Sequence, residues 1–348
     1  MSAENQGAHS SSDRNAPPFR AGALSPEEIR GECPQFRILI IGKANAGKTT
    51  ILRKVCNAKP DAKPIIYDAK GNEVVQEVSP EPTKSFESLF KFLRRRKGRS
   101  GDALVPSTDA PNNSTDVLNP STERGKHDIE YQLTYAGSNF IFHDSRGIES
   151  GSEDELKIVK EFIQKREQLV DLKDQLHVIW YCVPMDDHRP ISGAEKAFFS
   201  LGTGRVPVVL IFTKFDALEL KCYSELREQG KSHEEASIQA PGLANDTFQD
   251  KYLPRVQRAK FPPKTYVCLS GLDKEDNQCS ELSEKTMNIL DDDILINLFV
   301  STQQNNLDLC IKQSIKYVWK TEALSQMLLV YQIIAVFPNF WYSQEVCG

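Results

Sequence analysis

Short apolar runs recur along the chain, and most of them are separated by stretches with helical periodicity. Each run is dominated by β-branched and aromatic residues and is bounded by polar or turn-forming residues, as buried strands are. The runs are 36–41 (FRILII), 129–135, 139–143 (NFIFH), 177–182 (HVIWYC), 206–212 (VPVVLIF) and 264–269. Strands that alternate with helices usually form a mainly parallel sheet with helices on both faces. The pattern therefore predicts a three-layer α/β fold.

Three helices are predicted from the polar and apolar spacing. Residues 49–57 follow the first apolar run directly. The sequence after Ser152 begins with an S-x-x-E capping box, which is completed by Glu155, and continues with apolar residues at helical spacing. Residues 291–317 have the pattern of one long helix.

The termini and two internal segments differ in composition from this core. Residues 1–34 are rich in Ser, Ala, Pro and charge without periodicity, which predicts a disordered tail. Residues 98–125 predict a disordered insertion, whereas the charged residues 218–262 predict a helical one. A single domain at 35–319 and an apolar C-terminal helix or tail at 320–348 complete the expected organisation.

The composition narrows the classes of function. With 348 residues, of which 39% are hydrophobic, the chain can bury one large or two small cores. A net charge of −5 disfavours nucleic acid as a partner, because that affinity is built on excess Lys and Arg. The eight cysteines are scattered without a C-x-x-C pair, which predicts reduced thiols in a cytosolic protein. The N-terminus has no apolar run of the signal-peptide type, so secretion is not expected.

One motif lies at the junction of a predicted strand and a predicted helix. Residues 42–49 (GKANAGKT) match G-x-x-x-x-G-K-[ST], in which backbone N–H groups and the helix N-terminus face a phosphate. Lys48 is expected to span the β- and γ-phosphate oxygens, and Thr49 to place its hydroxyl on Mg²⁺. The predicted phosphate site consists of Gly42, Asn45, Ala46, Gly47, Lys48, Thr49 and Thr50.

A second motif ends the run at 139–143. The segment FIFHDSRG places Asp144 after the predicted strand and Gly147 three residues later, which is the D-x-x-G arrangement of nucleotide switches. Asp144 is expected to hold Mg²⁺ through water, and the Gly147 N–H to contact the γ-phosphate. Four residues match by chance in many proteins, so the motif indicates a nucleotide switch here because it ends an apolar run that follows the G-x-x-x-x-G-K-[ST] motif.

A third motif indicates which base is bound. Residues 213–216 (TKFD) follow an apolar run, and a carboxylate at Asp216 can accept hydrogen bonds from both N1–H and the 2-amino group of guanine, donors that adenine lacks there. Lys214 would pack its stem over the ring, and Thr213 completes the loop. A turn containing Ser270 and Gly271 would offer a backbone N–H to the guanine O6. An unmatched buried carboxylate is costly, so guanine should be strongly preferred over adenine.

These motifs, together with the segments RGKHDIEYQL and HVIWYC, carry a resemblance to a known group of proteins. They resemble G-domain proteins common in basidiomycete fungi, which belong broadly with the septin-like and Toc-like GTPases of the translation-factor-related class. The resemblance covers about residues 36–319 and implies a P-loop NTPase G domain that binds GTP or GDP with Mg²⁺. Thr213 stands where many small GTPases have Asn, which is an accepted variant.

The switch chemistry is less well marked. A switch threonine adds a hydroxyl to Mg²⁺ in the triphosphate state, and we assign this role to Thr122, with Ser121 and Thr115 as alternatives. Lys48, Gly147 and Thr122 are then the predicted catalytic residues. Ile148 stands where many switches carry the glutamine that orients water. Hydrolysis should therefore be slow, unless His143, Arg146 or a dimer partner across the nucleotide supplies the missing group.

Two further segments bear on partners. Residues 86–99 form an amphipathic pattern with a basic end, which fits a helix docked on the domain, contact with an anionic membrane, or nuclear import. Residues 323–342 are apolar but interrupted by polar residues and Pro338. They fit a packed or oligomerising helix as well as membrane association. The expected location is cytoplasmic, with membrane association left open.

Three functions compete at this point. The leading hypothesis is an enzyme, a regulatory GTPase that binds Mg-GTP or Mg-GDP and slowly hydrolyses GTP as a molecular switch. The second is a septin-like structural protein that holds GTP at an oligomer interface. The third is an ATP-binding P-loop protein, which Lys214 and Asp216 disfavour.

Overall fold

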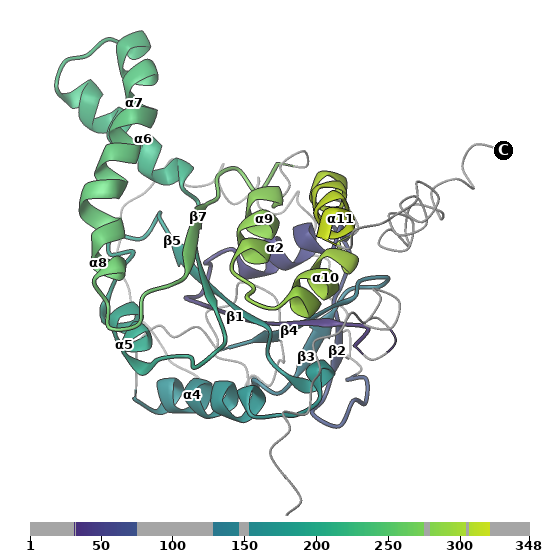
Figure 1. The fold of residues 1–348 in the computed structure, drawn as a ribbon. Coiled ribbons are helices and arrows are strands. Elements are labelled where there is room, and N and C mark those ends of the chain that lie inside the picture. Colours follow the sequence, from purple (N-terminus) through teal and green to yellow (C-terminus); the bar gives the residue numbers. More distant parts are fainter. Residues whose placement is uncertain are drawn as a thin grey trace, which may run out of the picture.

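A mainly parallel sheet forms the centre of the molecule (Figure 1). The computed structural model describes Gly31 and residues 33–74, 128–145, 153–274, 279–303 and 306–320. Within these residues the sheet has seven strands in the order β2-β3-β4-β1-β5-β6-β7. The strands are β1 (Phe36–Gly42), β2 (Ile65–Tyr67), β3 (Gln132–Thr134), β4 (Phe140–Asp144), β5 (Val178–Pro184), β6 (Val208–Thr213) and β7 (Thr265–Cys268). Each of the six predicted runs contains a strand.

The strand directions divide the sheet into two parts. β4, β1, β5, β6 and β7 run parallel to one another, whereas β3 pairs antiparallel with both β4 and β2 at one side of the sheet. The predicted α/β fold with a mainly parallel sheet is therefore confirmed.

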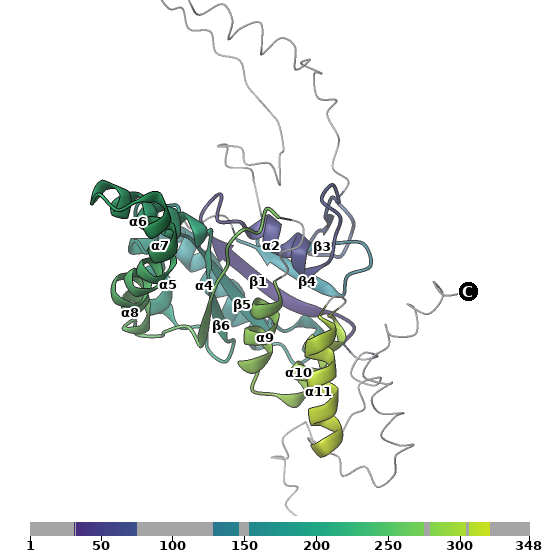
Figure 2. The same cartoon turned by 90° about the horizontal axis from the view of Figure 1, so that it is seen from above.

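Helices cover both faces of the sheet. They are α2 (Lys48–Val55), α4 (Glu153–Glu167), α5 (Gly193–Leu201), α6 (Asp216–Glu228), α7 (His233–Thr247), α8 (Leu253–Gln257), α9 (Ser280–Asn288), α10 (Asp293–Ser301) and α11 (Leu307–Lys320). A 3₁₀ turn at Leu172–Asp174 precedes β5, and a π-helical turn at Phe248–Tyr252 joins α7 to α8. The segment 218–262, predicted to be helical, contains most of α6 together with α7 and α8. The α6–α7 pair extends away from the sheet (Figures 1 and 2).

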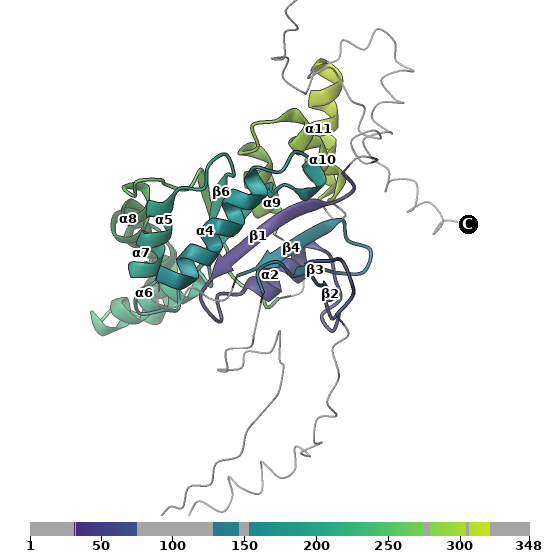
Figure 3. The same cartoon turned by 90° about the horizontal axis from the view of Figure 1, so that it is seen from below.

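Alternate side chains of each central strand enter two separate cores, because successive residues of a strand point to opposite faces. Leu39, Ile179 and Leu210 pack with α4, α5 and the α6–α8 region. Ile38, Trp180 and Ile211 pack on the other face with α2, α9 and α10. Figure 3 shows α4 lying across the first of these faces. Burial on both faces explains why the strands are continuous apolar runs rather than alternating ones.

The expectation of one long helix over 291–317 is wrong, because the chain forms α10 and α11 instead. The polar sequence between them accounts for the break. The Thr302 hydroxyl donates to the Phe299 carbonyl at the end of α10, and the Asn306 side chain accepts the Leu309 N–H at the start of α11. Such side-chain bonds compete with helix continuation.

Several predicted segments lie outside the described residues. These are most of the tail at 1–34, the insertion at 98–125, the amphipathic pattern at 86–99, the apolar segment 323–342 and the capping Ser152. Among the helices that the structure does describe, none combines the length and the apolar character needed to cross a membrane.

Candidate nucleotide-binding site

The predicted motifs meet at one edge of the sheet. Because β1, β4, β6 and β7 are parallel, their carboxyl ends lie at the same edge, where ligands of open α/β sheets bind. The phosphate loop follows β1, Asp144 ends β4, the TKFD loop begins at the end of β6, and the Ser270–Gly271 turn follows β7. We call this region the nucleotide edge.

The phosphate loop requires glycine at its first position. A Cβ on Gly42 would lie 2.5 Å from the Cys182 carbonyl oxygen and 2.9 Å from the Cys182 Cβ, since β5 passes directly beside it. The loop then turns through left-handed backbone at Asn45 (φ 59°) and Gly47 (φ 77°) before α2 begins. Close strand packing and the turn geometry together fix the path of the loop.

The start of α2 is suited to an anion. The first turn of α2 contains no acidic residue, so the positive end of the helix is not neutralised there. The Lys48 ammonium donates to the main-chain carbonyls of Gly42 (2.8 Å) and Lys43 (3.1 Å) and therefore lies over the loop itself. Thr49 is exposed at the same end of the helix.

The phosphate loop and the base-reading loop are joined by a buried hydrogen bond. The Thr213 hydroxyl donates to the Ala46 carbonyl at 3.0 Å, and the Thr213 side chain is almost fully buried. Thr213 thus connects the end of β6 to the loop after β1, two segments 167 residues apart in sequence.

The predicted base-reading residues lie together. Asp216 is exposed, and its Oδ1 accepts a hydrogen bond from the Gly271 N–H at 3.2 Å. The Phe215 N–H donates to the Leu269 carbonyl at 3.0 Å, which holds the two loops side by side. Lys214 has a left-handed backbone (φ 52°) between them. The structure therefore brings the TKFD loop and the Ser270–Gly271 turn into one site.

Sequence reasoning assigned no role to four charged residues at this edge, which are Lys43, Asp186, Asp187 and Glu195. Asp186 and Asp187 follow β5, and Asp186 pairs with Lys214 while Asp187 pairs with Lys43. The fourth, Glu195, is buried in α5 with its Oε1 3.8 Å from Lys43 Nζ. The sequence did hold a signal, because two acidic residues directly after an apolar run lie at the carboxyl end of a strand, where parallel sheets place ligand-binding loops.

The donors expected to hold Mg²⁺ are of a suitable kind. Asp144 ends β4 beside Ile40 of β1 and is half-buried, and Thr49 begins α2 after the phosphate loop. One carboxylate and one hydroxyl, with phosphate oxygens and water, form the hard oxygen set that Mg²⁺ prefers. The described residues contain no group of three or more His, Cys, Asp or Glu side chains able to hold a metal.

Only some of the predicted switch residues lie among the residues that the structure describes. Thr122, Arg146, Gly147 and Ile148 lie outside the described residues, so their assigned roles stay predictions. His143 is described, and the suggestion that it could orient water is wrong. It is fully buried on the α4 face.

His143 is instead part of a buried polar network, which we call the α4 cluster and which comprises Arg37, Glu130, His143, Arg166 and His177. The Arg37 Nη1 donates to His143 Nε2 at 2.9 Å, while His143 Nδ1 donates to the Ile129 carbonyl at 2.9 Å. Burial lowers the pKa of His143 well below its ordinary value. Both ring nitrogens are thus engaged in a neutral imidazole, which leaves none to position water.

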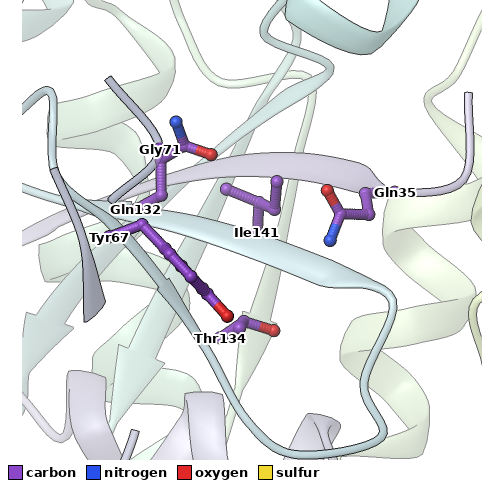
Figure 4. Close-up of a pocket in the computed structure, with 6 residues that line it drawn as sticks. All are labelled: Gln35, Tyr67, Gly71, Gln132, Thr134 and Ile141. Atoms are coloured by element: carbon purple, nitrogen blue, oxygen red, sulfur yellow. The ribbon is translucent and has the colours of Figure 1, made fainter. Parts of the chain in front are cut away.

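A hollow of about 250 Å³ lies away from the nucleotide edge, beside the antiparallel strands β2 and β3 (Figure 4). Tyr67 and Thr134 lie together on one side of Ile141, and Gln35 lies on the other. The complete lining is Gln35, Tyr67, Gly71, Gln132, Thr134 and Ile141. None of these residues belongs to the nucleotide motifs, and none is charged, so the hollow is not part of the candidate site.

No protein family matches the sequence, and no curated protein is significantly similar to it. Among solved structures, a septin GTPase domain from Chlamydomonas reinhardtii is 18% identical, with 70% of this chain and 77% of that chain covered and a TM-score of 0.27. A mutant NFeoB from S. thermophilus bound to GDP is 13% identical, with 90% of both chains covered and a TM-score of 0.33.

A bacterial dynamin from an oligomerised pair is 13% identical, with 92% of this chain but only 46% of the dynamin chain covered and a TM-score of 0.32. Similarity this low carries no functional conclusion. None of the three comes from a basidiomycete, so the narrower fungal resemblance is unsupported by them.

Proposed function

We propose that the protein binds guanine nucleotides at the nucleotide edge and hydrolyses GTP slowly as a molecular switch. The observation that carries the proposal is the juxtaposition of Asp216 with the Gly271 N–H, beside a phosphate loop that Thr213 joins to the same site. A carboxylate acceptor and a backbone donor side by side match the N1–H, 2-amino and O6 groups of guanine. Adenine has an acceptor at N1, a donor amino group at position 6 and no amino group at position 2.

The phosphate side supports the same proposal. Lys48 and the N-terminus of α2 supply positive charge where the β- and γ-phosphates are expected. Thr49 and Asp144 would hold Mg²⁺, which supplies charge stabilisation for phosphoryl transfer when bound. Slow turnover is part of the proposal because Ile148 follows Gly147. The proposal also assigns the switch threonine to Thr122 and includes a second copy of the chain across the nucleotide.

The experiment is competition of a labelled GDP analogue by unlabelled nucleotides on the full-length protein. GTP and GDP should displace the label at low concentration, and ATP should not. Asp216→Asn should lose guanine affinity by at least about 100-fold and gain affinity for xanthine nucleotides, because an amide offers a donor to the xanthine 2-oxo group. The matched control is Asp273→Asn, an exposed position in the neighbouring loop after β7. It should leave the guanine preference unchanged.

Equal competition by ATP, or unchanged guanine selectivity in Asp216→Asn, would overturn the guanine assignment. The same samples should be followed for phosphate release and for mass by light scattering. A septin-like structural role predicts nucleotide-dependent assembly with little turnover, whereas a switch predicts turnover without filaments. A rate of phosphate release per protein molecule that increases with protein concentration would indicate that a second copy completes the catalytic site.

A further inference from the structure

The loop after β5 lies between the two nucleotide-binding loops. β5 pairs with β1 on one side and with β6 on the other, so its carboxyl end emerges between the phosphate loop and the TKFD loop. The Met185 N–H donates to the Thr213 carbonyl at 2.9 Å, which extends the pairing with β6 to the first residue beyond β5. The next two residues, Asp186 and Asp187, are therefore placed between the two loops.

The two carboxylates bind lysines on opposite sides. Asp186 Oδ2 lies 2.6 Å from Lys214 Nζ in the TKFD loop. Asp187 Oδ2 lies 2.8 Å from Lys43 Nζ in the phosphate loop. The Arg189 N–H donates to Asp187 Oδ1 at 3.0 Å, and the Arg189 carbonyl accepts from Lys43 Nζ at 3.1 Å. Each nucleotide loop thus has one lysine held by the same short segment.

We propose that Asp186 is a positioning residue for guanine binding, which fixes Lys214 so that its stem forms one wall of the base site. This inference rests on the proposed function. The left-handed backbone of Lys214 directs the side chain out of the strand path, and the ion pair holds its far end. A lysine side chain that is already ordered loses less conformational entropy when a ring packs on it.

The exposure of the pair argues against a role in stability. The Lys214 side chain is 38% exposed and that of Asp186 is 44% exposed, and ion pairs this exposed contribute little to folding. The Lys43–Asp187 pair is less exposed and lies next to the buried Glu195, so it is the pair expected to support the fold. The two neighbouring aspartates therefore have separable roles.

The test is a double-mutant cycle on GDP affinity in the full-length protein. Asp186→Asn should weaken GDP binding about 5-fold. Asp186→Glu should keep most of the wild-type affinity because the carboxylate is retained. Asp186→Asn should have no further effect when Lys214 is already replaced by Met. The midpoint of thermal unfolding without nucleotide should stay unchanged in Asp186→Asn.

Asp187→Asn is the matched control, because its partner Lys43 is in the other loop and its effect should add to that of Lys214→Met. The inference is overturned if the losses from Asp186→Asn and Lys214→Met add, or if Asp186→Asn binds GDP as the wild type does. In that case the proposed function still stands, provided that the wild type binds GDP and Asp216→Asn changes base preference. If the wild type does not bind GDP, both fall.

Discussion

Two polar regions of this protein, the α4 cluster and the nucleotide edge, lie on the same sheet and differ in the burial of their side chains. In the α4 cluster, His177 Nδ1 accepts the Arg37 N–H at 2.9 Å and His177 Nε2 donates to the Leu172 carbonyl at 2.8 Å. Both histidines of that cluster are buried and have all their ring nitrogens bonded. At the nucleotide edge, by contrast, Lys214 is partly exposed, Asp186 and Asp216 are exposed, and their contacts are made between loops.

The contrast separates polar groups that support the fold from groups that remain available to a ligand. Hydrogen bonds occupy both ring nitrogens of each buried histidine, which leaves these rings no capacity for binding, although the buried Arg166 Nε has no hydrogen-bond partner among the described residues. Burial, together with the nearby Arg166 guanidinium, lowers the pKa of Arg37 to about 10, yet Arg37 stays charged and donates to the Lys173 carbonyl. We therefore expect changes in the α4 cluster to affect stability and changes at the nucleotide edge to affect affinity.

The largest expected effect is on nucleotide binding in Lys48→Ala. This variant removes the lysine that lies over the phosphate loop, and two charge-assisted hydrogen bonds to phosphate together contribute about 3 kcal/mol, or roughly 100-fold in affinity. Isothermal titration with GDP measures the loss, and Lys59→Ala, exposed after α2, serves as the control. Unchanged GDP affinity in Lys48→Ala would refute the phosphate-site assignment.

A comparable effect on stability is expected from pH. Burial lowers the pKa of His177 to about 4 in the folded protein, whereas the pKa of an unfolded histidine is near 6.5. The unfolded chain therefore binds the proton first as pH falls. The stabilisation is complete above about pH 6.5 and is lost progressively toward pH 4, by about 3 kcal/mol for this residue.

The pH effect can be isolated by denaturant unfolding of the wild type and His177→Gln. Between about pH 6 and 4.5, the free energy of unfolding should fall less steeply in the variant than in the wild type. The two slopes should differ by about 1.4 kcal/mol per pH unit. Identical slopes would show that His177 is protonated in the folded state, contrary to its hydrogen bonds.

The smallest expected effect sharpens the comparison most. Thr213→Val keeps the shape of the side chain but removes the hydroxyl that bonds to the Ala46 carbonyl, so GDP affinity should fall about 5-fold, or about 1 kcal/mol. The matched control is Thr302→Val. This variant removes a hydroxyl that is equally buried and that donates to the Phe299 carbonyl in α10, away from the nucleotide edge. Thr302→Val should lower the free energy of unfolding while GDP affinity stays constant. An equal fall in GDP affinity in both variants would contradict a specific role of Thr213 at the nucleotide edge.

Much of the fold was predictable because local patterns carry it. Strands buried on both faces are continuous apolar runs, and each of the six predicted runs contains one. The predicted long helix failed because its polar centre has two local alternatives, the Thr302 and Asn306 side-chain bonds, which periodicity does not detect. His143 was misjudged because nearness to a motif in sequence does not say which face of a strand a side chain occupies.

The sequence by itself determined six of the seven described strands and the motifs at their ends, but not β2, since periodicity and short motifs depend on neighbouring residues. Only the tertiary structure decided which motifs meet. Thr213 contacts Ala46, and Asp216 contacts Gly271, because parallel pairing gathers the ends of distant strands at one edge. The structure alone also assigned Asp186 to Lys214 and Asp187 to Lys43, because the position of β5 between β1 and β6 decides which loop each carboxylate reaches.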